Sequence, residues 1–256
     1  MELIMNEFKY IQDLLNKATY NNKDLGDKPS ATLNLLARYY REIGKTDDEI
    51  KNLLDNFLKS CLKDSYKPSK WIDSIFYQVK KSGKYSLKKV DEVTVTKSEI
   101  DTIQNVKGKA RQKVLFTLLI LAKFYNAVSD TNNNWCNMEY KKIFKLANVQ
   151  LSTDNQALLM NDLYSLGLIK YSKNISKLNV SVNFIDNDSD VALTVTQLRD
   201  LGKEYLMFCG EDYIRCEKCG VPIKKSRNGR TKYCFKCGVC VDREKAKDRM
   251  NNLRNK

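Results

Sequence analysis

The chain has 256 residues, 42% of them hydrophobic, and its 45 Lys and Arg outnumber its 31 Asp and Glu, which gives a formal charge of +14 and favours a polyanionic partner. Histidine is absent, which excludes Ser-His-Asp and Cys-His nucleophiles, HNH-type nuclease centres, Cys2His2 fingers and His-based metalloproteases. No spacing of carboxylates indicates an acid/base pair, so the sequence disfavours an enzyme and keeps a metal-dependent nucleic-acid enzyme only as an alternative.

Residues 1–97 have the pattern of a helical domain. A helix is expected over 31–43. A capping box of Thr46 and Glu49 starts a second helix, whose buried stripe runs from Ile50 to Leu58. A third helix is expected between Ser69, its cap, and Gly83. Its core-facing stripe is expected to consist of Trp71, Ile72, Ile75, Phe76 and Val79. At this helical spacing we interpret the aromatic rings as core side chains, and not as exposed platforms for nucleic-acid bases.

Residues 98–209 have the element order of a winged helix-turn-helix domain. Helices are expected over 111–126, 140–147 and 153–166, the last opened by a capping box of Thr153 and Gln156 and presenting Leu159, Leu163 and Leu166 on one face. Strands at 168–171 and 178–184 form a hairpin whose tip, 173–177, is the expected wing. A further strand at 191–195, followed by a short helix, is expected to pack on the wing.

This predicted domain has the elements of a DNA-reading module. The helix over 153–166 would enter the major groove, where its amide side chains reach base edges: Asn155, Gln156 and Asn161. The lysines of the hairpin would approach phosphates: Lys170, Lys173 and Lys177. Asp154 and Asp162 oppose this docking, because the phosphate backbone repels them. Contact with a protein, or a purely structural role, therefore stays an alternative.

The segment from residue 210 onward contains the most specific motif of the chain. Two Cys-x-x-Cys hooks supply four candidate metal ligands: Cys216, Cys219, Cys234 and Cys237. Four thiolates in such pairs bind a structural zinc ion, and the segment 221–233 between them is predicted to form a β-hairpin that turns at Asn228 and Gly229. We therefore expect a zinc ribbon with one Zn²⁺ per chain. Cys240, three residues beyond the second hook, is an alternative ligand.

Disulfide bonding among these cysteines is the competing interpretation. The first residues lack the basic start, apolar stretch and small-residue cleavage site of a secretory signal. The longest apolar run, 114–122, is about half as long as a bilayer span requires. We therefore expect a cytoplasmic protein, without a membrane partner, in a compartment where thiols stay reduced.

Positive charge is concentrated around the cysteine hooks. Residues 211–256 contain 14 Lys and Arg against 6 Asp and Glu. The residues expected to contact nucleic acid in this segment are Lys224, Lys225, Arg227, Arg230, Lys232, Arg243, Lys247 and Arg249. A basic tail that only improves solubility is the alternative.

Three stretches, 113–123, 143–147 and 162–169, together with the cysteine hooks, carry a family resemblance. They resemble phage and prophage proteins of low-GC Gram-positive bacteria that combine a winged helix with a short zinc ribbon. Residues 33–50 are similar to the small helical domains that follow primase catalytic modules in mobile-element replication proteins. The resemblance implies a DNA-associated role in the cytoplasm of a bacterial host cell.

The expected fold is mainly α with small β-sheets, in three domains that cover 1–97, 98–209 and 210–256. The expected function is that of a DNA-binding accessory or regulatory protein of phage or mobile-element type, in replication or transcription. Nucleic acid, DNA in particular, is the expected partner. A module that docks on a host protein or nucleoprotein complex is the alternative, and the oligomeric state stays open.

Overall fold

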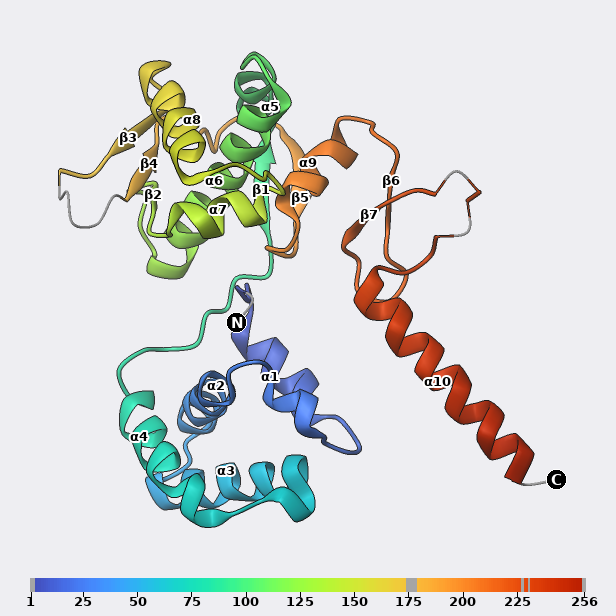
Figure 1. The fold of residues 1–256 in the computed structure, drawn as a ribbon. Helices are drawn as coiled ribbons and strands as arrows, with labels where there is room; N and C mark the ends of the chain where they lie inside the picture. The colour runs from blue at the N-terminus through green and yellow to red at the C-terminus, as the bar shows by residue number, and fades with distance from the viewer. Residues whose placement is uncertain (1–2, 174–178, 227, 230, 255–256) are drawn as a thin grey trace. The chain divides into compact units, whose positions relative to one another are not determined.

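The computed structural model describes residues 3–173, 179–226, 228–229 and 231–254, which are mainly helical with small antiparallel sheets (Figure 1). This agrees with the predicted fold class. The chain divides into two units, Met1–Asp91 and Glu92–Lys256. The finer division into three domains stays a prediction. Among the helices of the described residues, none combines the length and the apolar composition needed to cross a membrane.

The first unit consists of helices around one apolar core. Its elements are α1 (Glu7–Leu15), η1 (Asn22–Leu25), α2 (Pro29–Glu42), α3 (Asp47–Leu62), η2 (Lys63–Ser65), η3 (Pro68–Lys70) and α4 (Ile72–Ser82). Helices α3 and α4 both pack on α2. The capping box of α3 is confirmed, since Thr46 N donates to Glu49 Oε2 at 2.8 Å and Glu49 N donates to Thr46 Oγ1 at 3.3 Å.

The buried face of α4 differs from the predicted stripe. The side chains that face the core are Ile75, Gln78, Val79 and Ser82. Ile72 and Phe76, which we expected in the core, are 50% and 51% exposed. The reason lies in α2, where Arg41 donates from Nε to Ser82 Oγ at 2.8 Å and from Nη2 to the Val79 carbonyl at 3.1 Å. These bonds turn a partly polar face of α4 toward α2.

The start of α4 also differs from the prediction. Ser69 lies in η3, and Trp71 is the N-cap of α4 without a side-chain hydrogen bond to the helix. Pro68 explains the difference, because its fixed φ angle suits the first position of a helical turn. Ser69 therefore belongs to the short helix η3 that Pro68 starts, and not to α4. Trp71 packs against the core as expected, although it is only partly buried.

The second unit contains the remaining elements. They are β1 (Val93–Thr96), α5 (Lys97–Gln104), α6 (Lys109–Ser129), β2 (Trp135–Cys136), α7 (Tyr140–Leu146), α8 (Thr153–Ser165), β3 (Ile169–Tyr171), β4 (Val180–Val182), β5 (Val191–Val195), α9 (Leu201–Phe208), β6 (Tyr213–Arg215), β7 (Pro222–Lys224) and α10 (Phe235–Arg254). Helix α6 is central and contacts α5, α7, α8 and α9 as well as β1, β2 and β4. Its middle is buried on all sides, which explains why its sequence is a continuous apolar run.

A buried ion pair fixes α5 against α6. Glu99 is fully buried, and Lys123 Nζ lies 2.8 Å from both of its carboxylate oxygens. Glu99 also accepts from the backbone N–H of Thr96 at 2.8 Å and of Asp186 at 3.0 Å, and Lys123 donates to the Thr94 carbonyl at 3.0 Å. Full hydrogen bonding is the condition under which two charges are tolerated in a protein interior.

Three strands form a small sheet in the order β2-β4-β3, which includes the predicted hairpin. The tip, 174–178, lies outside the described residues, and with it Lys177. The expected strand at 191–195 is present as β5 and pairs antiparallel with β1, with Val93 opposite Val195. The wing on which we expected it to pack lies, apart from residue 173, outside the described residues. One expectation for this region is wrong. Leu166 does not share the buried face of α8 with Leu159 and Leu163, because the helix ends at Ser165 and Leu166, its C-cap, is 58% exposed.

The cap of α8 is one residue earlier than predicted. Ser152 is the N-cap, and its Oγ accepts from Asn155 N at 3.4 Å. Gln156 does not close a capping box, because its side-chain amide donates to the Leu151 carbonyl at 3.0 Å.

Candidate metal centre

The four cysteines of the two hooks meet at one point. The Sγ atoms of Cys216, Cys219, Cys234 and Cys237 all lie within 4.8 Å of one another, and those of Cys219 and Cys234 are 3.7 Å apart. A tetrahedral zinc ion with Zn–S bonds of about 2.3 Å requires S···S distances of about 3.8 Å. The four residues can therefore hold a metal ion, and their geometry and donor atoms are compatible with zinc.

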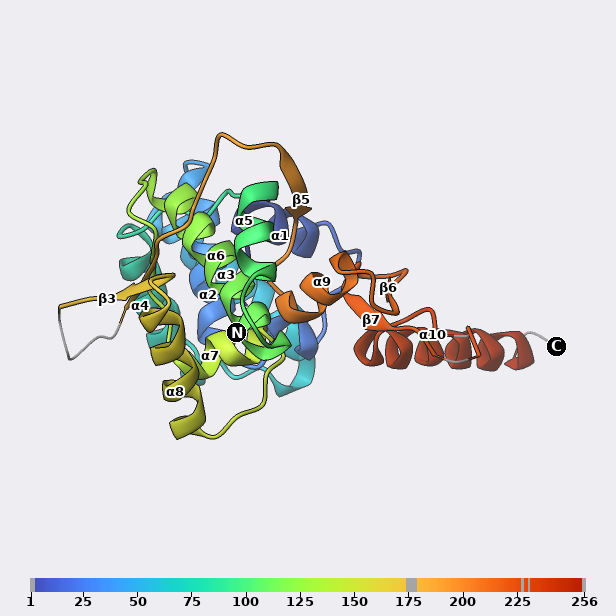
Figure 2. The same cartoon turned by 90° about the horizontal axis from the view of Figure 1, so that it is seen from above.

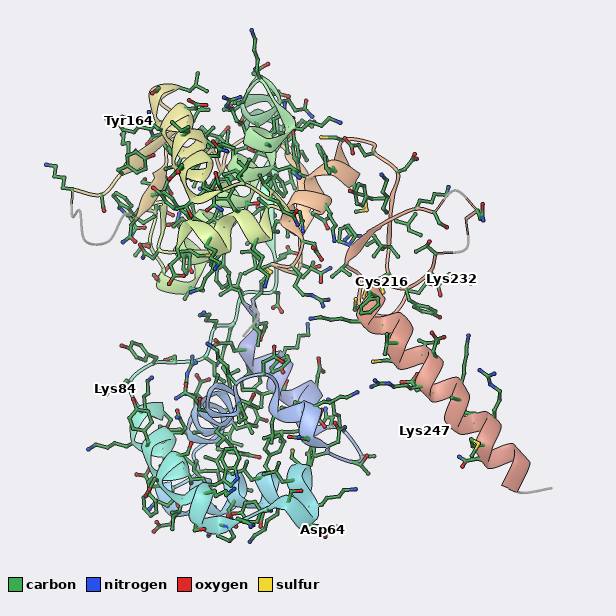
Figure 3. The ribbon with its side chains drawn as sticks, viewed as in Figure 1. Asp64, Lys84, Tyr164, Cys216, Lys232 and Lys247 are labelled. Carbon is green, nitrogen blue, oxygen red and sulfur yellow. The ribbon has the colours of Figure 1, made fainter. Side chains whose placement is uncertain are left out.

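The two hooks come from different kinds of local structure. The first hook is the turn between β6 and β7, where Gly220 has a φ angle of +71°, a conformation that favours glycine. Gly220 N donates to the Cys216 carbonyl at 2.8 Å, which closes this turn. The second hook starts α10, with Cys234 just before its first residue and Cys237 in its first turn. Figure 3 shows Cys216 beside this first turn.

The hairpin at this centre is not the predicted one. We expected strands on both sides of Asn228 and Gly229, but β7 pairs with β6, so that Ile214 lies opposite Ile223. Residues 231–233 are not a strand. The first hook therefore forms the turn of the observed hairpin, because its two ligands need a tight reversal of the chain to share one ion.

Backbone N–H groups stabilise negative charge on one sulfur. Burial raises the pKa of the Cys216 thiol, but N–H groups of Cys234, Cys219 and Lys218 donate to its sulfur and lower the pKa to about 6. The N–H of Cys234 lies 3.2 Å from this sulfur. Burial and the three neighbouring sulfurs raise the pKa of the Cys237 thiol. Thiolates this close repel one another, and a bound cation removes that repulsion.

A small apolar cluster and an ion pair support the centre. Val221 and Ile223 are buried beside Cys216. Arg215 at the end of β6 donates from Nη1 and Nη2 to the two carboxylate oxygens of Glu204 on α9, at 2.9 Å and 2.5 Å. Glu204 is buried, which makes this fork-shaped pair stronger than an exposed one. Sequence patterns gave no signal for this contact, because it joins two separate elements.

The other cysteines do not belong to the group. Cys240 is exposed and lies outside the cluster, although it follows Cys237 by only three residues. Cys209 is also exposed, whereas Cys61 and Cys136 are buried in apolar surroundings.

The predicted nucleic-acid contacts near the metal centre are at the surface where they are described. Lys224, Lys225 and Lys232 are exposed around β7, and Arg243, Lys247 and Arg249 are exposed on α10. Arg227 and Arg230 lie outside the described residues. Both views show α10 as a single helix that leads away from β6 and β7 (Figures 1 and 2). Every residue from 242 to 251 is exposed, and Glu244 accepts a hydrogen bond from Lys218 of the first hook at 2.8 Å.

The contacts predicted for the 153–166 helix have a different environment. Asn155 and Asn161 on α8 and Lys170 and Lys173 near β3 are exposed, whereas Gln156 is partly buried and bonded to the backbone. Asp162 is paired with Arg111, whose Nε donates to it at 3.1 Å. The outer face of α8 also carries an unexpected apolar feature, since Leu158 and Tyr164 are 61% and 49% exposed. Tyr164, labelled in Figure 3, is one of these residues. It stacks on Tyr171 of β3 with ring centroids 5.1 Å apart.

All four candidate ligands lie in a single stretch of the chain, and the hairpin of β6 and β7 rests on α9. Comparison with protein families, with curated proteins and with solved structures found no match to this chain.

Proposed function

We propose that this chain is a DNA-binding accessory or regulatory protein of phage or mobile-element type, in which a structural zinc ion organises a basic surface. The observation that carries the proposal is the direct connection of the four-cysteine group to α10, an exposed helix rich in basic residues. We interpret the β6–β7 hairpin with the start of α10 as a zinc ribbon. The metal ion, bound by Cys234 and Cys237 at the start of α10, holds the first turn of this helix in place.

The ligand set supports a structural and not a catalytic role for the metal. Four thiolates complete the tetrahedral coordination of zinc, so no position stays open for water or substrate. The chain has no histidine that could take part in general acid or base chemistry near the metal.

The charges of α10 favour a phosphate backbone as the partner. No acidic side chain of the described residues lies within ion-pair distance of Arg243, Lys245, Lys247 or Arg249. Arg243 and Lys247 are four residues apart, as are Lys245 and Arg249, so positive charge lies on two sides of the helix. A helix of this kind can approach both phosphate strands that border a DNA groove.

The arrangement of α6, α7 and α8 with the sheet β2-β4-β3 supports a winged-helix interpretation of the region before the ribbon. Helix α8 would be its reading helix, but it contains no Lys or Arg. We therefore assign most of the affinity for DNA to the ribbon and α10, and a positioning role to the winged helix.

The test is the binding of a labelled duplex DNA by the whole protein, measured by fluorescence anisotropy at about 50 and about 200 mM salt. The double substitution Arg243→Gln with Lys247→Gln should weaken binding and reduce the slope of log K against log salt by about 2. The matched control is Lys23→Gln with Lys28→Gln, an equal change of charge at exposed positions of the first unit. Absence of binding at both salt concentrations contradicts the proposal.

A second candidate function is docking on a protein, and the outer face of α8 favours it. Leu158 and Tyr164 are exposed there, on a helix without basic residues. Affinity capture from a nuclease-treated bacterial lysate with wild-type protein and with Leu158→Asp tests this function. A protein that the wild type captures and the variant does not supports docking. Proteins that are captured only when the nuclease treatment is omitted argue against it.

A further inference from the structure

The outward face of α4 in the first unit combines aromatic rings with unpaired lysines. Phe76 and Tyr77 are 51% and 60% exposed, although aromatic side chains in a small helical domain are usually buried in its core. They follow Ile75, which faces the core, and because successive residues of a helix point about 100° apart, both rings are turned away from Ile75. The two rings are therefore available to a partner molecule.

Cations lie close to both rings. Lys51 Nζ is 4.6 Å from the centroid of Phe76, and Lys81 Nζ is 5.7 Å from the centroid of Tyr77. Cation–π attraction favours these positions, and Lys51 also donates to Asp48 Oδ1 at 2.8 Å. A ligand with flat rings and negative charges close together could stack on the aromatic rings and pair with the lysine ammonium groups.

The two rings border a surface groove of about 560 Å³. Charged residues from three helices line it: Arg41 of α2, Asp47 and Lys51 of α3, and Lys80 of α4. Asp47 is the negative group, and Arg41 neutralises it at a distance of 2.6 Å. Lys51 pairs with Asp48 at 2.8 Å, so the groove's positive charge without an acidic partner among the described residues is that of Lys80.

The surrounding chain segment has the same sign of charge. Residues 67–89 contain seven lysines and one acidic residue, Asp73. Among the described residues, no acidic side chain lies within ion-pair distance of Lys67, Lys70, Lys80, Lys81 or Lys84. Figure 3 shows Lys84, which follows α4. Such a density of unpaired lysines around an apolar patch complements a polyanion and disfavours a purely apolar protein partner.

We propose that this face of α4 binds single-stranded nucleic acid. Bases stack on Phe76 and Tyr77, and Lys80, Lys81 and Lys84 approach the phosphates of the same strand. A duplex fits less well, because its bases are stacked on one another and cannot reach the two rings. The surface lies in the first unit and is separate from the metal centre, so this inference does not depend on the function proposed for the ribbon.

The experiment measures the anisotropy of two labelled oligonucleotides, oligothymidylate and oligouridylate, both longer than about 16 nucleotides, with the whole protein. The variant Phe76→Leu with Tyr77→Leu keeps apolar side chains but removes both rings, and it should bind about tenfold or more weakly. The variant Phe76→Tyr with Tyr77→Phe exchanges the rings and should bind within about twofold of the wild type. The two oligonucleotides distinguish a DNA strand from an RNA strand as the preferred ligand.

A charge variant provides a second, independent measurement. Lys80→Gln with Lys81→Gln and Lys84→Gln should reduce the salt slope for single strands by about 2. Duplex binding should change little in these variants, which distinguishes this surface from α10. The proposal is overturned if the wild type binds neither oligonucleotide, if the leucine variant binds as tightly as the wild type, or if the ring-exchanged variant loses as much affinity as the leucine variant.

Discussion

At Gly202, α9 passes so close to the end of α7 that a side chain has no space. A Cβ atom at this position would lie 1.8 Å from the carbonyl oxygen of Ala147 and 2.4 Å from its carbonyl carbon. Both are backbone atoms, so relief requires the two segments to separate. We predict that Gly202→Ala lowers the free energy of unfolding of the second unit by about 3 kcal/mol, as measured by urea denaturation.

Gly238 provides the matched control for this substitution. It lies in α10, and no atom outside its own helical backbone comes within 4 Å of a Cβ at that position. Alanine is favoured over glycine in a helix by up to about 1 kcal/mol. Gly238→Ala should therefore leave stability unchanged or raise it slightly. Equal losses in both variants would argue against a steric cause at Gly202.

The cysteines outside the metal centre should differ sharply in reactivity. Burial raises the pKa of the Cys61 thiol to about 11 and that of the Cys136 thiol to about 12, so their thiolate forms are rare at neutral pH. Cys209 and Cys240 are exposed. We predict that a thiol reagent modifies Cys209 and Cys240 in the folded, metal-bound protein and reaches Cys61 and Cys136 only after unfolding. Mass spectrometry of labelled peptides measures this, and rapid labelling of Cys136 would contradict it.

At the scale of elements, α10 should depend on the metal. Its residues 242–251 are exposed, and an isolated helix of this length is only marginally stable in water. Its first turn is anchored through Cys237, so chelation of the metal or Cys216→Ser should reduce the helical circular dichroism of the protein. Elemental analysis should give about one zinc per wild-type chain and a clear loss in the variant.

Cys240→Ser is the control for this prediction, since Cys240 lies in α10 but outside the cluster. It should retain both metal and helicity. Full metal content in Cys216→Ser would show that the ligand assignment is wrong.

Elements with strong local signals could be predicted closely from the sequence. Both hydrogen bonds of the box at Thr46 and Glu49 form as expected, because they need only residues three apart. The buried face of α4 could not be predicted, since it depends on hydrogen bonds from Arg41, which lies on another helix. Strands β1 and β2 could not be predicted either. They are short, and each forms by pairing with a strand that is distant in the sequence.

The candidate site shows the same contrast. The cysteine group was predictable because the ligand spacing is written in one short stretch of sequence. The hairpin that carries the first hook could not be predicted, because β7 pairs with β6, which lies before the hook in the sequence. The pair of Arg215 with Glu204 was equally hidden, although it ties the site to α9. Spacing in the sequence indicates which cysteines can share a metal ion, whereas the elements that hold these cysteines in place depend on tertiary contacts.

At the scale of the whole molecule, each unit has a core of its own, which makes separate unfolding testable. A substitution of Glu7 should destabilise the first unit alone. Glu7 is 4% exposed, and its Oε2 accepts from Arg38 Nη2 at 2.8 Å and from Lys88 N at 3.0 Å. These bonds join α1 to α2 and to the segment that follows α4.

We predict that Glu7→Ala lowers the free energy of unfolding of the first unit by about 3 kcal/mol, because it leaves the largely buried Arg38 without its counter-charge. Asp13→Ala, an exposed acidic position on the same helix, should have little effect. Calorimetry should show that Glu7→Ala shifts one transition while the transition of the second unit and the metal content stay constant. A common shift of both transitions would mean that the two units unfold as one cooperative block.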